Sequence, residues 1–277
     1  MSQNGLPDSI GLVRRCGRPA PGRGGFTLTD IVVCMAIVAV LLAILFPTFG
    51  RAKEASRRVV CASNQRQIGL ALAMYADDFG GRLPPSVFLD AALVPPGTFQ
   101  RHSHETVRVR LATTPTGKDA GSWDGLGLLA STNFIRTPEV FYCPSHRGPN
   151  RLPEFRSLWA AGAGDIVGNY QYRGGIDGPE RTDGLNARGL WQLSPTFSLV
   201  SDGMRSQGEV NHADGMNVLS AALSVRWFSD TGSTLHDLLP ETPSHEASAI
   251  VDLAWRRFDA SLGTPSQNPA ISGNPGY

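Results

Sequence analysis

The chain has 277 residues, a formal net charge of +1 and 41% hydrophobic residues, with 31 glycines and 20 prolines. This length leaves room for a sizeable folded domain. The balanced charge gives no case for nucleic-acid binding, so we expect no nucleic acid among the partners. The many glycines and prolines favour turns and loops over a helical bundle.

The first informative segment is an apolar run near the N-terminus. Residues 31–46 carry no charged side chain, and the stretch 26–46 would span about 30 Å as a helix, roughly one hydrocarbon core. Arginines precede the run, as a cytoplasmic flank should, but basic residues also follow it, so charge alone does not fix its orientation. A cleaved secretory signal has a shorter apolar region before its cut, whereas Gly24 and Gly25 come before this run. The pattern predicts a membrane-spanning helix, and an anchor that is never cut is the simplest alternative.

The residues at the start of the run are more specific. The sequence Gly-Phe-Thr-Leu begins at Gly25, the early acid Asp30 follows, and Pro47 closes the run. This order resembles the N-terminus of type IV prepilins and type II secretion pseudopilins. The resemblance implies that prepilin peptidase cuts between Gly25 and Phe26 and that the new N-terminal Phe26 is methylated. It also implies that Asp30, in place of the usual glutamate, pairs with the terminal amine of a neighbouring subunit, since a carboxylate in a membrane needs a partner.

An apolar stripe predicts that the helix continues beyond Pro47. A glycine pair followed by prolines predicts its end after Phe79. From Phe26 to Phe79 such a helix would be roughly 80 Å long. Its first half is apolar all round and its second half is amphipathic, which is typical of a helix that leaves a membrane and packs against a globular head. The stripe consists of Cys61, Ile68, Leu72, Tyr75 and Phe79.

Beyond residue 82 the signals change to strands and loops. A late helix is expected over residues 244–260, with Pro243 at its start and Gly263 at its end. The predicted fold class is therefore α+β and pilin-like: a long N-terminal helix packed on a globular head with an antiparallel β-sheet. The strand candidates are residues 106–111 and 197–200, together with a hairpin formed by residues 216–219 and 223–227.

A second resemblance lies in the head. Three blocks resemble the class of prepilin-type proteins named for a His-x9-Asp-Gly motif, and His212 and Asn217 belong to the last block. Where that class has Asp-Gly after the nine-residue spacing, this chain has Ala222 and Leu223, so a turn or a ligand is lost. Glycine adopts the positive φ of a tight turn readily and leucine does not. The blocks are residues 141–145, 198–202 and 211–219.

Cys61 and Cys143 are the best disulfide candidates in the chain. Both are expected outside the cytoplasm, where disulfides persist, and a bridge would staple the helix to the head. Two separate buried thiols are the alternative. Cys34 lies in the apolar run and is interpreted as a small apolar side chain.

Other polar clusters carry weaker signals. His102 and His104 could begin a metal site, but no cysteine or third histidine lies at a ligand spacing nearby, which favours a polar loop. His212 with Asp202 and Asp214 could form an acid–base group, although a structural histidine at a turn is the better interpretation. No nucleophile elbow, phosphate loop or zinc-protease motif is present, so we expect no enzyme activity and no cofactor. Calcium is the alternative to the absence of a cofactor, with donors from Asp177, Asp183 and Asp202, although no loop has a diagnostic ligand pattern.

These features predict a structural subunit of a pilus-like or type II secretion pseudopilus assembly. Its expected partners are prepilin peptidase, other pilin-like subunits and the inner membrane, with the head outside the cytoplasm. The alternative is a membrane-anchored extracytoplasmic head that binds a ligand, such as a glycan, and never polymerises. The predicted parts are a leader (1–25), a membrane-spanning half-helix (26–47), an amphipathic half-helix (48–81), a globular head (82–262) and a flexible tail (263–277).

Overall fold

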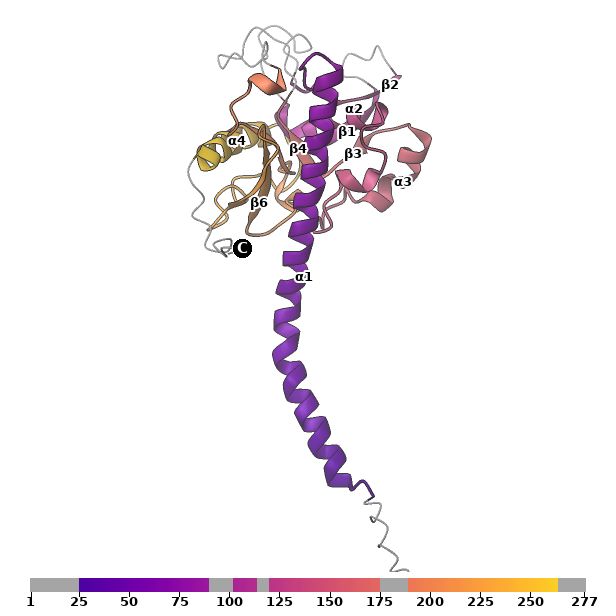
Figure 1. The fold of residues 1–277 in the computed structure, drawn as a ribbon, viewed down its shortest axis with the longest axis vertical. Helices are drawn as coiled ribbons and strands as arrows, with labels where there is room; N and C mark the ends of the chain where they lie inside the picture. The colour runs from indigo at the N-terminus through magenta and orange to yellow at the C-terminus, as the bar shows by residue number, and fades with distance from the viewer. Residues whose placement is uncertain (1–24, 90–101, 114–119, 175–188, 264–277) are drawn as a thin grey trace, which may run out of the picture. The chain divides into compact units, whose positions relative to one another are not determined.

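The structure, a computed structural model, describes residues 25–89, 102–113, 120–174 and 189–263 of the chain (Figure 1). The chain divides into two compact units, Met1–Gly50 and Arg51–Tyr277. The first unit contains the N-terminal part of helix α1, and the second contains the rest of α1 together with the head. The leader and the tail expected from the sequence lie almost wholly outside the described residues.

Helix α1 comprises Leu28–Asp78, which confirms the prediction of one long N-terminal helix. In the first unit its large apolar side chains, from Ile31 to Phe49, are exposed along the isolated chain. Among the described residues, α1 is the one helix long and apolar enough to cross a membrane. An apolar surface on all sides of a helix suits lipid rather than water, so this part of α1 fits a membrane span.

The glycine pair after α1 ends the helix as predicted. Gly80 and Gly81 have φ values of 64° and 84°, and the Gly81 N–H donates to the carbonyl of Ala76. The left-handed pair thus donates a hydrogen bond to a carbonyl of the last turn that has no acceptor role within the helix.

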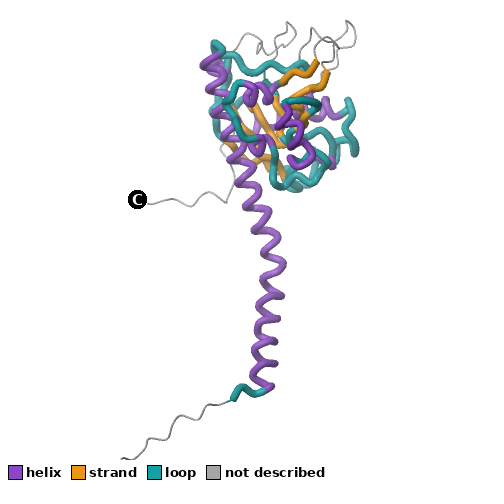
Figure 2. Tube along the Cα trace, turned by 90° about the vertical axis from the view of Figure 1, so that its right-hand side faces the viewer, coloured by secondary structure: helices purple, strands orange, loops and turns teal. Residues whose placement is uncertain are grey.

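The head contains two antiparallel sheets rather than the single sheet expected from the sequence. Figure 2 shows their strands inside the head, among helices and loops. The first sheet has the strand order β2-β1-β3 and the second has the order β4-β5-β6-β7. The strands are β1 Arg108–Thr113, β2 Ala120–Trp123, β3 Ile166–Val167, β4 Tyr170–Tyr172, β5 Ser198–Asp202, β6 Gly215–Ser220 and β7 Val225–Ser229.

The chain leaves the first sheet and enters the second at Gly168 and Asn169. The Gly168 N–H donates to Val107 O at 2.8 Å, and the Asn169 N–H donates to Phe141 O at 2.9 Å. These bonds go to the last residues of two 3₁₀ helices, Ser103–Val107 and Pro138–Phe141, instead of a neighbouring strand, so the ladder is interrupted and β3 and β4 belong to different sheets. The α+β class is confirmed.

Most elements expected in the head are present with shifted ends. Strand β1 starts two residues late because Ser103–Val107 forms a 3₁₀ helix, in which the Thr106 hydroxyl donates to Ser103 O at 2.8 Å. The predicted hairpin is β6–β7, paired from Gly215 with Ser229 to Leu219 with Val225. The late helix is α4, Ala247–Gly263. Two shorter helices, α2 Leu128–Ser131 and α3 Leu152–Ala161, were not expected.

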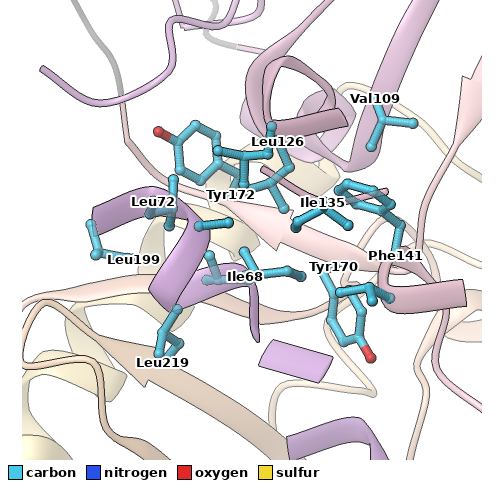
Figure 3. Packing of buried hydrophobic residues seen from close by; sticks show 14 of the residues in the cluster. Ile68, Leu72, Val109, Leu126, Ile135, Phe141, Tyr170, Tyr172, Leu199 and Leu219 are labelled. Atoms are coloured by element: carbon cyan, nitrogen blue, oxygen red, sulfur yellow. The ribbon is translucent and has the colours of Figure 1, made fainter. Parts of the chain in front are cut away.

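The main core forms where the second half of α1 meets both sheets. Ile68 and Leu72 of α1 are fully buried among side chains of both sheets, including Val109, Tyr170 and Leu199 (Figure 3). In the view of Figure 1, α2, α3 and the first sheet lie to the right of α1, and β6 and α4 lie to the left. A second cluster of buried apolar side chains packs beneath α4. The burial of α1 side chains against both sheets stabilises the attachment of the head to this helix.

Candidate functional site

One face of α1 carries polar residues before its apolar stripe. Glu54, Arg58, Cys61 and Gln65 follow one another at spacings of four, three and four, and Ile68 continues the series. Residues at these spacings share one helix face. The sequence analysis recognised the apolar part of this stripe from Cys61 onward and missed the polar members, because hydrophobic periodicity does not register them.

The polar part of the stripe meets a buried group of metal-ligand side chains, here named the four-donor cluster. Cys61, Cys143, Asp202 and His212 each offer one ligand atom, and these atoms lie within 4.8 Å of one another. Cys61 lies on α1, Cys143 follows a 3₁₀ helix, Asp202 ends β5, and His212 lies in the loop before β6. All four residues are buried.

The structure brings the two predicted disulfide partners together without bridging them. Cys61 and Cys143 are free thiols in one cluster. The expected proximity of the pair is therefore confirmed, while the disulfide itself stays a prediction.

Three direct contacts define the geometry of the cluster. The Cys61 Sγ donates to Asp202 Oδ1 at 2.9 Å, and Cys143 Sγ lies 3.5 Å from His212 Nε2. His212 Nε2 lies 3.8 Å from Asp202 Oδ2. The Tyr170 hydroxyl adds a fourth contact, 3.3 Å from Cys61 Sγ.

His212 is held by α1 and by an aromatic ring. Its Nδ1 bonds Glu54 Oε1 at 2.7 Å, and the Ser145 hydroxyl donates to both oxygens of the same carboxylate. The Trp227 ring packs edge-on against the imidazole, with centroids 5.6 Å apart. With Nδ1 fixed on Glu54, the ring turns Nε2 toward Cys143 and Asp202.

Asp202 is a buried carboxylate with several donors. Its Oδ2 accepts the Asn217 backbone N–H at 2.6 Å, and its Oδ1 accepts Asn211 Nδ2 at 3.1 Å and Gln65 Nε2 at 3.3 Å. Asn217 therefore has a structural part here, and its side chain also donates to Arg58 O at 3.4 Å. The two motif residues of the head, His212 and Asn217, both contact α1.

The pKa values of the two thiols in the cluster are shifted in opposite directions. Burial and hydrogen bonding to Cys143 raise the pKa of the Cys61 thiol well above its usual value. Burial also acts to raise the pKa of Cys143, but hydrogen bonds from Cys61 and His212 outweigh it and lower that pKa. Burial acts to lower the pKa of His212, yet its contact with Cys143 and the charge of Asp202 raise it to about 9.

A pocket of about 380 Å³ opens beside the cluster and reaches Cys143. Asn64 of α1, Tyr142 and Asn169 also line it. Its wall includes His146, whose Nδ1 bonds Asn211 and whose buried Nε2 has no hydrogen-bond partner among the described residues. The pocket gives Cys143 a route to solvent although the residue itself is buried.

Other predicted site residues are not gathered here. Asp214 is exposed and pairs with Arg58 at 3.2 Å, so it takes no part in an acid–base group with His212. Asp177 and Asp183, the other proposed calcium donors, lie outside the described residues. Asp202 faces sulfur and nitrogen donors, which do not suit calcium.

His102 and His104 acquire the third histidine that the local sequence lacked. The ring of His245 lies 5.0 Å from that of His102 and 6.0 Å from that of His104. Both nitrogens of His104 are already engaged, Nδ1 by Ser248 and Nε2 by Glu105. This arrangement favours a structural role over a metal site.

Ala222 and Leu223, which replace the Asp-Gly of the head motif, lie in a hairpin turn. Between β6 and β7, the Leu223 N–H donates to Ser220 O and the Ser220 N–H donates to Ser224 O, both at 2.9 Å. Leu223 has a φ of 58°, the left-handed conformation that closes three-residue hairpin loops. The turn that the sequence analysis expected to be lost with Asp-Gly is therefore formed, with leucine in a conformation that suits glycine better.

The N-terminal site lies in the first unit. Phe26 is exposed, and an added Cβ at Gly25 would meet nothing within 4 Å. Asp30 accepts the Thr27 N–H at 2.9 Å, and the Asp30 N–H donates to the Thr27 hydroxyl at 3.3 Å. This reciprocal pair is a capping box at the start of α1, a role for Asp30 that the sequence analysis missed.

Comparison with known proteins gives two matches. The profile of the family described as "Protein of unknown function (DUF1559)" matches residues 50–230. The chain belongs to this family. A curated relative, "Prepilin peptidase-dependent protein A" of Clostridium perfringens, is 33% identical over 66 residues, which cover 21% of this chain and 47% of the relative. The chain thus spans about half of that relative's length, and no solved structure matches.

The DUF1559 match contains the whole four-donor cluster together with Glu54, and it ends before α4. The prepilin-type segment at Gly25 and Phe26 lies outside it. The family, the relative and the long apolar helix with its α+β head together identify a pilin-like protein.

Proposed function

We propose that this protein is a structural subunit of a pilus-like or type II secretion pseudopilus assembly. Prepilin peptidase cleaves its precursor after Gly25, and the new N-terminal Phe26 is methylated. The subunit crosses the inner membrane once through α1, with the head outside the cytoplasm, and it belongs to the His-x9-Asp-Gly class with a degenerate motif. It has no catalytic role.

The observation that carries this proposal is the position of Gly25 and Phe26. They stand directly before a 51-residue helix whose first half is exposed and apolar. A peptidase can reach this segment because Phe26 is not packed against other described residues. The relative's name, which refers to prepilin peptidase, gives independent support.

The outer face of α1 in the second unit supports packing against neighbouring subunits. Val59, Leu70 and Met74 expose 70%, 52% and 52% of their surface, although they lie on the helix that carries the core. Apolar side chains left exposed on a helix face are costly in water and stabilise contacts between helices.

The processing step is tested on the N-terminus of the membrane-extracted protein. Mass spectrometry of the wild type should find a mature chain beginning with methylated Phe26, and Gly25→Val should leave the full-length precursor in the membrane. Gly50→Ala is the matched control, since Gly50 also has open space around it but lies within α1. A wild-type chain that keeps its first residues, or that is cut beyond residue 30, contradicts the proposal.

Assembly is tested separately by crosslinking. Cysteine pairs placed between the N-terminal helices of this protein and other pilin-like subunits should crosslink when the secretion machinery is present. A processed protein that never crosslinks would instead favour the membrane-anchored, ligand-binding head.

A further inference from the structure

We infer that the four-donor cluster binds one divalent cation of the zinc class and thereby clamps α1 to the head. The inference goes beyond the proposed function, because it concerns the fold of the head and not processing or assembly. Its residues are Cys61, Cys143, Asp202 and His212.

The chemistry of the donors selects the metal. Two thiolates, one imidazole and one carboxylate form a set that zinc binds with four ligands in tetrahedral geometry. Calcium and magnesium prefer oxygen donors, and only Asp202 offers them here. Four protein ligands close the coordination shell, so the site is structural rather than catalytic.

The distances fit with small adjustments. In a tetrahedral site with Zn–S of about 2.3 Å and Zn–N or Zn–O of about 2.0–2.1 Å, ligand atoms lie roughly 3.3–3.8 Å apart. The sulfur of Cys143 and Nε2 of His212 are 3.5 Å apart, and Nε2 and Asp202 Oδ2 are 3.8 Å apart. Cys61 Sγ lies 2.9 Å from the other carboxylate oxygen, Oδ1, in a hydrogen bond that breaks when Cys61 loses its proton to bind the metal.

The residues around the ligands orient them as in known metal sites. Glu54 holds Nδ1 of His212 at 2.7 Å and leaves Nε2 free to bind metal, the carboxylate–histidine–metal arrangement. The donors to Asp202, from Asn211, Asn217 and Gln65, offset the negative charge that two thiolates and a carboxylate bring together.

The clamp joins segments that are distant in sequence. Cys61 comes from α1, whereas the other three ligands come from the head. Metal binding displaces the protons held by the two thiols and by Nε2 of His212, and these protons pass to solvent. The pocket beside Cys143 gives the ion its entry path. A Cys61–Cys143 disulfide would use the same two sulfurs, so disulfide and metal site exclude each other.

The primary test uses the full chain in detergent, without a metal-affinity tag and with thiols alkylated at lysis in a parallel sample. Inductively coupled plasma mass spectrometry should find about one zinc per chain. After chelation, the wild type should take up Co²⁺ and develop a thiolate-to-cobalt charge-transfer band with tetrahedral visible bands. This spectrum needs no ligand variant, so the result does not depend on whether a variant folds.

Variants then assign the ligands. His212→Gln and Cys143→Ser should abolish stoichiometric zinc, and Glu54→Gln should keep the site but weaken zinc binding about 10- to 100-fold. Cys34→Ser and Asp214→Asn are the matched controls, since both residues are exposed and lie outside the cluster. Both controls should retain zinc and the cobalt spectrum.

Three results would each overturn the inference. One is a wild-type chain that neither carries zinc nor takes up Co²⁺ with a thiolate band. Another is a Cys61–Cys143 disulfide in the peptide map of protein alkylated at lysis. The third is loss of zinc in Cys34→Ser, which would place the binding site elsewhere.

Discussion

Leu223 shows how a single residue can keep a turn at the cost of backbone strain. Its φ of 58° closes the β6–β7 hairpin, and a Cβ in this conformation costs about 1–2 kcal/mol. Glycine would avoid that cost but would lose more chain entropy on folding. The hairpin forms nonetheless, because the strand pairing on either side of the loop fixes its ends.

Leu223→Gly should therefore be more stable than Leu223→Ala by about 1 kcal/mol. Both variants lose the same partly buried side chain, and only alanine keeps the strained Cβ. Urea unfolding followed by tryptophan fluorescence measures the difference, since all five tryptophans lie in the head. An alanine variant as stable as the glycine variant would show that the turn is not strained.

Asp124 is a buried carboxylate whose charge opposes folding. Burial raises the pKa of Asp124 to about 6, although it accepts hydrogen bonds from the Ser86 hydroxyl and the Val87 N–H. The folded-state pKa lies above the ordinary value of 3.8, so the folded protein holds this proton more tightly than the unfolded chain. The stabilising contribution is complete below pH 3.8 and is lost as the pH rises through about 6.

Raising the pH from about 4 to about 8 should therefore remove roughly 2 kcal/mol that Asp124 contributes at pH 4. Asp124→Asn should abolish that component, because the amide keeps the size and the acceptor oxygen without the charge. The difference between variant and wild type in the free energy of unfolding, measured across this pH range, isolates the effect. Asp77→Asn, at an exposed site on α1, is the control and should follow the wild type.

At the scale of elements, the start of α1 gives Asp30 two functions that must be separated. The capping box with Thr27 stabilises the first turn within one chain. The proposed assembly needs the charge of Asp30 to meet the terminal amine of a neighbouring Phe26. Both functions would be lost in an alanine variant, so Asp30→Ala alone cannot distinguish them.

Asp30→Asn and Thr27→Val distinguish the two. Asp30→Asn removes the charge and keeps the size, so crosslinking between N-terminal helices should fall sharply while cleavage and membrane insertion persist. Thr27→Val removes one bond of the capping box and keeps the charge, so assembly should persist. Asp30→Glu should also assemble. Equal losses in Asp30→Asn and Thr27→Val would assign Asp30 to the cap instead of the subunit contact.

The elements themselves were largely predictable where one strong local signal decides them. The apolar run, the stripe from Cys61 to Phe79 and the glycine pair predicted α1 and its end, and two neighbouring strand candidates predicted the β6–β7 hairpin. The second sheet was missed because the break at Gly168 and Asn169 depends on hydrogen bonds to Val107 and Phe141, which are distant in sequence.

At the scale of the whole molecule, the candidate site was only half predictable. The pairing of Cys61 with Cys143 followed from their positions on the helix stripe and in the head. The sequence also grouped His212 with Asp202, and the two lie 3.8 Å apart, but their meeting with the two cysteines depends on the order of strands in the second sheet, which no local pattern encodes. Glu54 was missed because a charged residue on a helix usually faces water, and only its bonds to His212 and Ser145 reveal its part.

The order of contacts along α1 has a mechanical consequence for a subunit under tension. A pull on the N-terminal half of the helix reaches Glu54 and Cys61 before it reaches Ile68 and Leu72, because force travels along the helix from its own end. Short, directional hydrogen bonds such as those of Glu54 and Cys61 resist a small displacement stiffly and then break, whereas apolar packing yields gradually. The contacts of Glu54 and Cys61 therefore bear the load first, and the apolar core bears it once they have broken.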